Sequence, residues 1–306
     1  MKDFKLPDEL MFIKNRNAKQ KISKVTMHGK VCVITGATSG VGLEATKRLA
    51  EGGASIVMVC RDPQKAQAVK HMIMDKYKVS VEYVIADLSS LDEVRQAAAT
   101  ILEMCPRIDV LINNAGMHST KVTYTKDGYE TVFCVNHLAS FLLTNLLLER
   151  LIESSPSRIL QINSEGHRFN GLDLEDINWE KRRYKGLKGY GASKTAQLMT
   201  VWEIAKQLKD TKVTINAMHP GDVKTNIGNN NGWLYRLYTR LVTSRFLKDP
   251  LISGEAIYYL ASDPELENVS GRFFHLTIEE KPAKHALDEK TAKKVFDLSL
   301  KMTGLR

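Results

Sequence analysis

Cysteine is scarce in this chain, and its cysteines are not paired by spacing. Cys32, Cys60, Cys105 and Cys134 form no C-x-x-C pair among 306 residues. This excludes a disulfide framework and a cysteine-based zinc site, and it fits a reducing compartment, so we expect a cytoplasmic protein. The eight histidines show no metal-ligand spacing either, and the sequence therefore predicts no metal.

Long apolar runs are also missing. None approaches the roughly 20 residues of a membrane span, so we expect no integral membrane segment. The run LMFI at 10–13 follows acidic residues and is too short for the core of a signal peptide. The chain has no internal repeat and no low-complexity linker. Its 43% hydrophobic and 26% charged residues are ordinary for one large globular domain.

Positive charge is unevenly placed. Residues 1–30 contain eight Lys/Arg and three Asp/Glu, which gives +5 of the net +9. This basic N-terminal arm is either a solvated extension or a surface for nucleic acid or an anionic membrane. We favour the extension and predict no nucleic-acid partner, while peripheral membrane contact through the arm stays open.

Short apolar segments alternate with helical patterns after the arm. Such alternation predicts βαβ units, a parallel sheet and right-handed crossovers. We expect an α/β fold: one doubly wound Rossmann domain over 31–276, with about seven parallel strands and helices on both faces. It would include a substrate loop at 222–250, and 277–306 would form a C-terminal extension of loop and short helix. Six strands are predicted at 31–35, 55–60, 81–86, 108–113, 158–163 and 212–218.

A glycine-rich turn follows the first predicted strand. The stretch TGATSGVG (35–42) spaces Gly36, Gly40 and Gly42 as G-x-x-x-G-x-G before a helix. Glycines there permit a tight turn and let backbone approach a pyrophosphate at the helix N-terminus. A plain glycine-rich turn is the alternative, but the position between strand and helix favours dinucleotide binding.

The end of the second strand bears on the choice between NAD and NADP. An NAD site usually offers an acid to the ribose, whereas an NADP site offers an arginine. Here the strand ends VCRDP, with Arg61 after Cys60. Asp62 before Pro63 is typical of a helix N-cap. We therefore assign Arg61, with Lys65 as an assisting residue, to a 2′-phosphate: NADP(H) is preferred and NAD(H) is the alternative.

The segment KGYGASKTA (188–196) sets Tyr190 four residues before Lys194, with small residues between. On a helix these two residues share a face. A neighbouring ammonium favours a phenolate, so we expect a lowered tyrosine pKa and a general acid/base. An ordinary solvated helix face is the alternative.

Together the motifs resemble the short-chain dehydrogenase/reductases of the classical type, over roughly residues 30–276. The ordered set is TGATSGVG, DL at 87–88, NNAG at 113–116, Asn136, Ser164, YGASK and HPGDVKT at 219–225. Within that family the chain is most similar to the retinol-dehydrogenase-like branch, through CRDPQKA, GLDLEDINWEK and the 26-residue gap between Ser164 and Tyr190.

The resemblance implies a role for each matching residue. Tyr190 would protonate the carbonyl oxygen, Ser164 would hydrogen-bond it, and Lys194 would hold the nicotinamide ribose and tune the tyrosine. Asn136 would hold a water that links Lys194 to solvent. The remaining positions would bind the cofactor, namely Gly36, Thr38, Ser39, Gly40, Val41, Gly42, Arg61, Asp87, Leu88, Asn113, Ala115, Gly116, Pro220, Gly221, Val223 and Thr225.

The expected activity is hydride transfer between a nicotinamide cofactor and a small-molecule carbonyl or alcohol. Segments 117–120, 165–171 and 226–247 would line the substrate pocket, and their apolar content suits a lipophilic or aromatic substrate. Glu165, beside Ser164, would either disturb the serine or bind a substrate group. The alternative functions are a sugar-modifying enzyme of the extended type and a catalytically silent dinucleotide-binding regulator. A homo-oligomer remains open.

Overall fold

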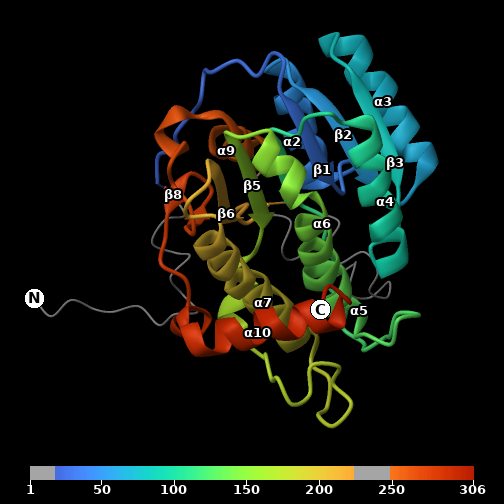
Figure 1. The fold of residues 1–306 in the computed structure, drawn as a ribbon, viewed down its shortest axis with the longest axis vertical. Helices are drawn as coiled ribbons and strands as arrows, with labels where there is room; N and C mark the ends of the chain where they lie inside the picture. The colour runs from blue at the N-terminus through green and yellow to red at the C-terminus, as the bar shows by residue number, and fades with distance from the viewer. Residues whose placement is uncertain (1–17, 224–248) are drawn as a thin grey trace, which may run out of the picture.

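The computed structural model describes residues 18–223 and 249–306 (Figure 1). Thr225 and most of the predicted substrate loop lie outside these ranges. The six predicted strands are confirmed to within two residues at either end. The strands are β1 (Val31–Thr35), β2 (Ser55–Cys60), β3 (Val81–Ile85), β4 (Val110–Asn113), β5 (Ser157–Ile162), β6 (Val213–His219), β7 (Phe273–His275) and β8 (Ile278–Glu279).

The strands form one sheet in the order β3-β2-β1-β4-β5-β6-β7-β8. The first seven are parallel, as predicted, whereas β8 pairs antiparallel with β7. The chain reverses its direction of travel across the sheet between β1 and β4. In a doubly wound fold, ligands bind beyond the carboxyl ends of the strands at this switch point. The TGATSGVG turn after β1 and the NNAG turn after β4 both begin there.

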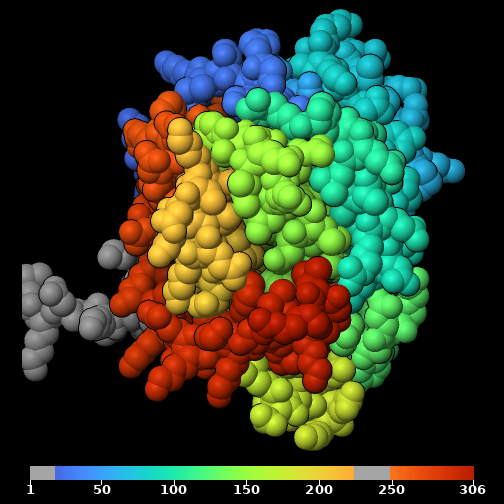
Figure 2. All heavy atoms as spheres, in the orientation of Figure 1, coloured from blue at the N-terminus to red at the C-terminus, as the bar shows by residue number. Residues whose placement is uncertain are grey.

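Helices cover both faces of the sheet (Figure 1). Helices α2 (Gly40–Glu51), α3 (Pro63–Tyr77) and α9 (Leu251–Ser262) pack on one face. The other face is covered by α4 (Leu91–Met104), α6 (Ala139–Glu153) and α7 (Gly186–Gln207), with α10 (Glu289–Met302) lying against α7 (Figure 2). Shorter turns are α5 (Thr131–Phe133), η2 (Cys134–Leu138), η3 (Glu165–Phe169), η5 (Pro264–Leu266) and η6 (Lys284–Leu287).

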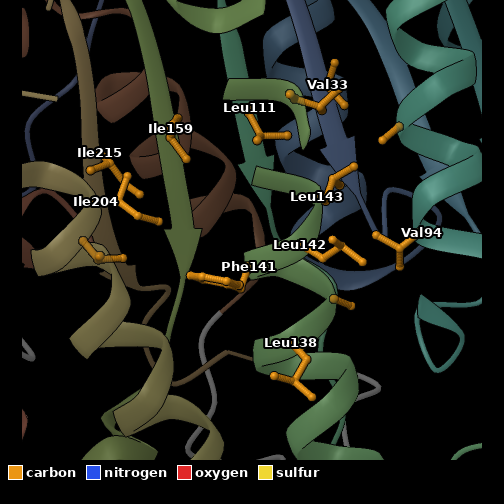
Figure 3. Packing of buried hydrophobic residues seen from close by; sticks show 14 of the residues in the cluster. Val33, Val94, Leu111, Leu138, Phe141, Leu142, Leu143, Ile159, Ile204 and Ile215 are labelled. Carbon is orange, nitrogen blue, oxygen red and sulfur yellow. The ribbon is translucent and has the colours of Figure 1, made fainter. Parts of the chain in front are cut away.

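The period of two along each strand divides the core between the two faces. On β1, Val33 joins the cluster beneath α4, α6 and α7, whereas Cys32 and Ile34 join the cluster beneath α2 and α9. Figure 3 shows Phe141 of α6 beside the end of β5, and Leu142 on the side of α6 that faces Val94 of α4. All four cysteines are buried free thiols, in agreement with the expected lack of disulfides.

The segment Thr131–Glu153, which runs through α5, η2 and α6, is long and apolar enough to cross a membrane by length and composition. However, 72% of its most apolar window is buried within the fold. Its leucines and Phe141 belong to the core cluster under the sheet. The segment is therefore apolar because it packs in the core of the domain.

The second half of the basic arm is not a free extension. Ser23 and Met27 are buried, and Lys21 donates a hydrogen bond from its backbone to Thr277 and forms an ion pair with Glu265. Arg48 of α2 also donates to the Ser23 carbonyl. Residues 18–30 therefore pack on the domain, which differs from the solvated extension that the sequence predicted.

Candidate functional site

The glycine turn after β1 is close-packed. Gly36 and Gly40 have φ of +68° and +54°, a conformation that side chains rarely adopt. A Cβ at Gly42 would lie 2.2 Å from the Gly36 carbonyl oxygen and 2.4 Å from the Asn114 amide nitrogen. The turn therefore requires glycine at each of these positions. It places the backbone of residues 36–42 at the switch point between β1 and β4.

Helix α2 opens from this turn with its first N–H groups available to a ligand. Ser39 is the N-cap residue, but its side chain makes no capping hydrogen bond within the described ranges. Thr38 is half-buried, Ser39 is exposed, and Val41 is buried under the turn. Unpaired N–H groups and the helix dipole favour an anion at this position. These residues fit the pyrophosphate of a dinucleotide.

The loops after β1 and β4 are tied together by hydrogen bonds that the sequence did not predict. Thr35 Oγ1 accepts from the backbone of both Asn114 and Ala115, at 3.0 and 2.9 Å. Asn114 Nδ2 donates back to the Thr35 carbonyl. Asn113 instead donates from its side chain to Thr144 of α6, which links the end of β4 to that helix.

The end of β2 confirms the predicted helix cap. Asp62 is the N-cap of α3 and accepts from the backbone of Gln64 and Lys65, with Pro63 in the first turn. These hydrogen bonds lower the pKa of the Asp62 carboxyl. The Lys65 ammonium pairs with the same carboxylate at 3.1 Å. Arg61 is exposed beside this cap.

Two further predicted segments lie at the same edge of the sheet. Asp87 follows β3 and accepts from the Ser89 backbone, while Leu88 packs on the core. After β6, the Pro220 carbonyl accepts from Ser253, and Gly221 has φ of +82°. Val223 is buried, and Thr225, a predicted cofactor-binding residue, lies outside the described residues.

Helix α7 brings Tyr190 against the loop after β5. Its ring packs beside Ser164 and Gly166, and Ser164 Oγ accepts from the Gly166 backbone at 3.0 Å. A Cβ at Gly166 would lie 2.4 Å from Cε1 of the Tyr190 ring. The sequence did not identify Gly166, although it stands two residues after Ser164. The absence of a side chain there is what lets the ring approach the serine.

Lys194 lies one turn after Tyr190, but it does not act on the phenol as predicted. Its Nζ is 6.0 Å from the tyrosine ring centroid and donates to the Ile162 carbonyl at 2.8 Å. Burial raises the pKa of Tyr190 to about 12, with Ser164 opposing this shift, and lowers the pKa of Lys194 to about 7. The predicted lowering of the tyrosine pKa is therefore wrong for this arrangement, because burial disfavours both charged forms.

A buried amide network fixes Lys194. Gln197 Oε1 accepts from the Lys194 ammonium at 3.2 Å, and its Nε2 donates to the Asn136 carbonyl at 3.0 Å. Asn163 Nδ2 donates to the Lys194 carbonyl and to Gln197 Oε1. Sequence inspection missed Gln197, whose only signal is its position three residues after the lysine.

Asn136 sits in η2, a single π-helical turn, a feature often found at functional sites. Its side chain accepts from the Met117 backbone at 2.7 Å and donates to the Met117 carbonyl and to Ser193 Oγ. A Cβ at Gly116 would lie 3.3 Å from Asn136 Oδ1 and 3.8 Å from Lys194 Nζ. The four predicted catalytic residues and the NNAG turn thus meet at one place.

Two of the three predicted pocket segments, 117–120 and 165–171, lie within the described ranges. His118 is buried and packs edge-on to Tyr190, with ring centroids 5.7 Å apart, while Phe169 is 41% exposed. The predicted pocket residues at 226–247 lie outside the described ranges. A cavity of about 720 Å³ between α7, β7 and α10 is lined by residues such as Trp202 and Leu287 and does not include the catalytic residues.

Comparison with known proteins agrees with this geometry. The sequence profile of the short chain dehydrogenases matches residues 30–232. The chain is 36% identical over 290 residues to "Retinol dehydrogenase 13" of Homo sapiens, covering 92% of this chain and 87% of that protein. It is 39% identical over 292 residues to "Retinol dehydrogenase 14" of Mus musculus, covering 91% and 87%.

Solved structures show the same fold. An uncharacterized protein from Mycobacterium paratuberculosis superposes with a TM-score of 0.72 at 29% identity, covering 92% of this chain and 95% of that one. A short chain dehydrogenase from Shigella flexneri 2a, complexed with NADP, gives a TM-score of 0.67 at 22% identity, covering 83% and 99%.

The chain therefore belongs to the short chain dehydrogenase family, in its retinol-dehydrogenase-like branch. Members of this family are oxidoreductases, and this chain is an NAD(P)-dependent enzyme acting between CH–OH and C=O groups.

Proposed function

We propose that the protein is an NADP(H)-dependent reductase of lipophilic carbonyls, with Tyr190 as the proton donor. The convergence of Tyr190, Ser164 and Lys194 beside the open N-terminus of α2 supports this proposal most strongly. When bound, the nicotinamide cofactor supplies the hydride.

Each catalytic side chain then has a distinct task. With a pKa of about 12, Tyr190 is a protonated phenol at neutral pH, so it is suited to donate a proton to a developing alkoxide. Ser164 hydrogen-bonds the same oxygen. Lys194 contacts the ribose of the cofactor, and Gln197, which also donates to the Asn136 backbone carbonyl, holds the lysine in place. The Asn136 side chain fixes the loop at Met117.

The contacts at the end of β2 support the preference for NADP(H). Asp62 already accepts two backbone hydrogen bonds as the cap of α3, so it is engaged in the fold rather than free for a ribose. Arg61 remains exposed beside it, and a guanidinium offers paired donors to a phosphate. Arg61 therefore binds the 2′-phosphate in this proposal, with NAD(H) as the weaker cofactor.

The lipophilic substrate class rests on His118, whose ring packs on Tyr190, on Met117 and Phe169 in the predicted pocket segments, and on relatives named retinol dehydrogenases. We also propose a cytoplasmic location, with peripheral membrane contact through the basic arm. Lys21 is already paired with Glu265, so that contact would use other basic residues.

Turnover of a carbonyl panel tests this function directly. The purified protein is assayed with NADPH and with NADH against retinal, aromatic aldehydes, aliphatic ketones and a polar sugar aldehyde. We expect NADPH oxidation with lipophilic carbonyls and little with the sugar. Binding of NADPH without turnover of any member would instead support the catalytically silent regulator.

A further inference from the structure

A cluster of one carboxylate and two imidazoles lies next to Ser164, and the proposed reaction does not use it. Glu165 follows Ser164 in the turn after β5, His219 ends β6, and His275 ends β7. One ligand atom from each lies within 4.8 Å of the others. His219 and His275 are paired across the two parallel strands, with ring centroids 5.1 Å apart.

Several polar atoms of this cluster are buried without a hydrogen-bond partner. His219 is 5% exposed, and both of its ring nitrogens lack a partner among the described residues. Oε1 of Glu165 is in the same condition. The nearest carboxylate to His219 is Asp222, whose Oδ1 is 3.9 Å from Nε2 and beyond hydrogen-bond distance. Buried polar atoms without partners are costly, and a bound cation would satisfy the lone pairs of the imidazole and the carboxylate.

The surroundings hold the carboxylate in a fixed orientation. Arg168 donates to Oε2 of Glu165 and, at 2.5 Å, to Glu280. Oε1 of Glu165 has no hydrogen-bond partner in the described part of the chain. This oxygen lies beside the imidazoles of His219 and His275. Arg168 thus bridges the two carboxylates and holds Glu165 in place. Such support of a ligating carboxylate is common in metal sites.

We propose that Glu165, His219 and His275 form a binding site for a divalent transition-metal ion, with Zn²⁺ as the best match. Two imidazoles and one carboxylate are a ligand set of zinc sites that keep an open position. Zinc bonds of about 2.0–2.2 Å require the three side chains to draw together by small torsional changes. The ion would join the ends of β5, β6 and β7 directly beside Ser164.

Sequence spacing could not reveal this site. The three residues are 54 and 56 positions apart, and they meet only because neighbouring parallel strands end at one edge of the sheet. The expectation that the chain binds no metal came from short-range spacing alone, which does not apply to ligands supplied by separate strands.

Metal titration of the full chain, free of any histidine tag and stripped with a chelator, tests the proposal. Zn²⁺ binding is followed by calorimetry and by metal content after dialysis, and Co²⁺ is used as a spectroscopic probe. We expect one Zn²⁺ per chain, a higher melting temperature with Zn²⁺ than without it, and Co²⁺ absorption of the kind given by low-coordinate nitrogen and oxygen ligation.

Single variants identify the ligands. Glu165→Gln, His219→Gln and His275→Gln should each weaken Zn²⁺ binding by at least about tenfold, whereas His71→Gln, at an exposed histidine on α3, should leave it unchanged. Circular dichroism checks that each variant folds, and Glu165→Gln keeps the test decisive if a histidine variant does not. No Zn²⁺ retained by the native chain, or binding that survives the cluster variants and is lost in His71→Gln, would overturn the proposal.

Discussion

Replacing Gly166 by alanine should impair turnover by displacing the Tyr190 ring. The added Cβ would lie 2.4 Å from Cε1 and 2.6 Å from Cδ1 of Tyr190, and 3.3 Å from Ser164 Oγ. Ordinary contact begins near 3.4 Å, so the ring has to move by about 1 Å. A misplacement of that size costs roughly 10²-fold in rate, or about 2.7 kcal/mol of transition-state stabilisation.

Steady-state kinetics with NADPH and the best carbonyl of the panel measure this effect. We expect kcat to fall by about 10²-fold while NADPH affinity stays within a factor of about two, because the glycine turn at the β1–α2 junction is elsewhere. Gly128→Ala is the matched control: Gly128 has a left-handed φ of +80°, but its new Cβ would meet nothing within 4 Å. It should lower stability and leave kcat unchanged. A Gly166→Ala enzyme with more than about a third of the native kcat would refute the assigned packing of the ring.

Three further changes separate the roles of the remaining residues. We expect the native enzyme to prefer NADPH over NADH by at least tenfold in kcat/KM, or roughly 1.4 kcal/mol. Arg61→Ala should reduce this preference, mainly by weakening the binding of NADPH. An unchanged ratio of kcat/KM would exclude Arg61 as the phosphate ligand. Asp62→Ala should lower the melting temperature by removing the cap of α3, and Asp62→Asn should restore it. Neither variant should change the ratio of kcat/KM for NADPH to kcat/KM for NADH. A shift of that ratio toward NADPH would instead make Asp62 a ribose ligand. Burial lowers the Lys194 pKa to about 7, so its charge is lost as pH rises through that value, and kcat/KM for carbonyl reduction should fall above about pH 7. Lys194→Ala should weaken NADPH binding and abolish this fall in kcat/KM at high pH. A fall that persists in the variant would belong to another group.

Much of the fold could be predicted because parallel strands buried on both faces are nearly continuous apolar runs. Six such runs became β1 to β6, and the Asp-Pro pair became the start of α3 as expected. Strand β8 has only two residues, Ile278–Glu279, and is too short to have a pattern. The π-helical turn at Asn136 likewise has no sequence signal, since it depends on packing against Met117 and Ser193.

The site was predictable where its residues are close in sequence or belong to a recognisable motif. Tyr190 and Lys194 share a helix, but the direction of their pKa shifts depends on burial, which spacing does not report. Gly166 and Gln197 were missed because their roles are set by contacts with Tyr190 and Lys194 in the folded chain. The roles of Arg61 and Asp87 remain predictions, and Thr225 lies outside the described residues.

The most direct test of the proposed chemistry is a paired measurement on Tyr190→Phe. Carbonyl reduction and NADPH binding are measured on the same preparation, the first by steady-state kinetics and the second by fluorescence titration. If Tyr190 is the proton donor, the rate falls by about 10²–10⁴-fold and NADPH affinity is nearly unchanged, because removing one hydroxyl leaves the fold and the nucleotide turn intact. A variant that retains more than about a tenth of the native rate would contradict the assignment of Tyr190 as the proton donor.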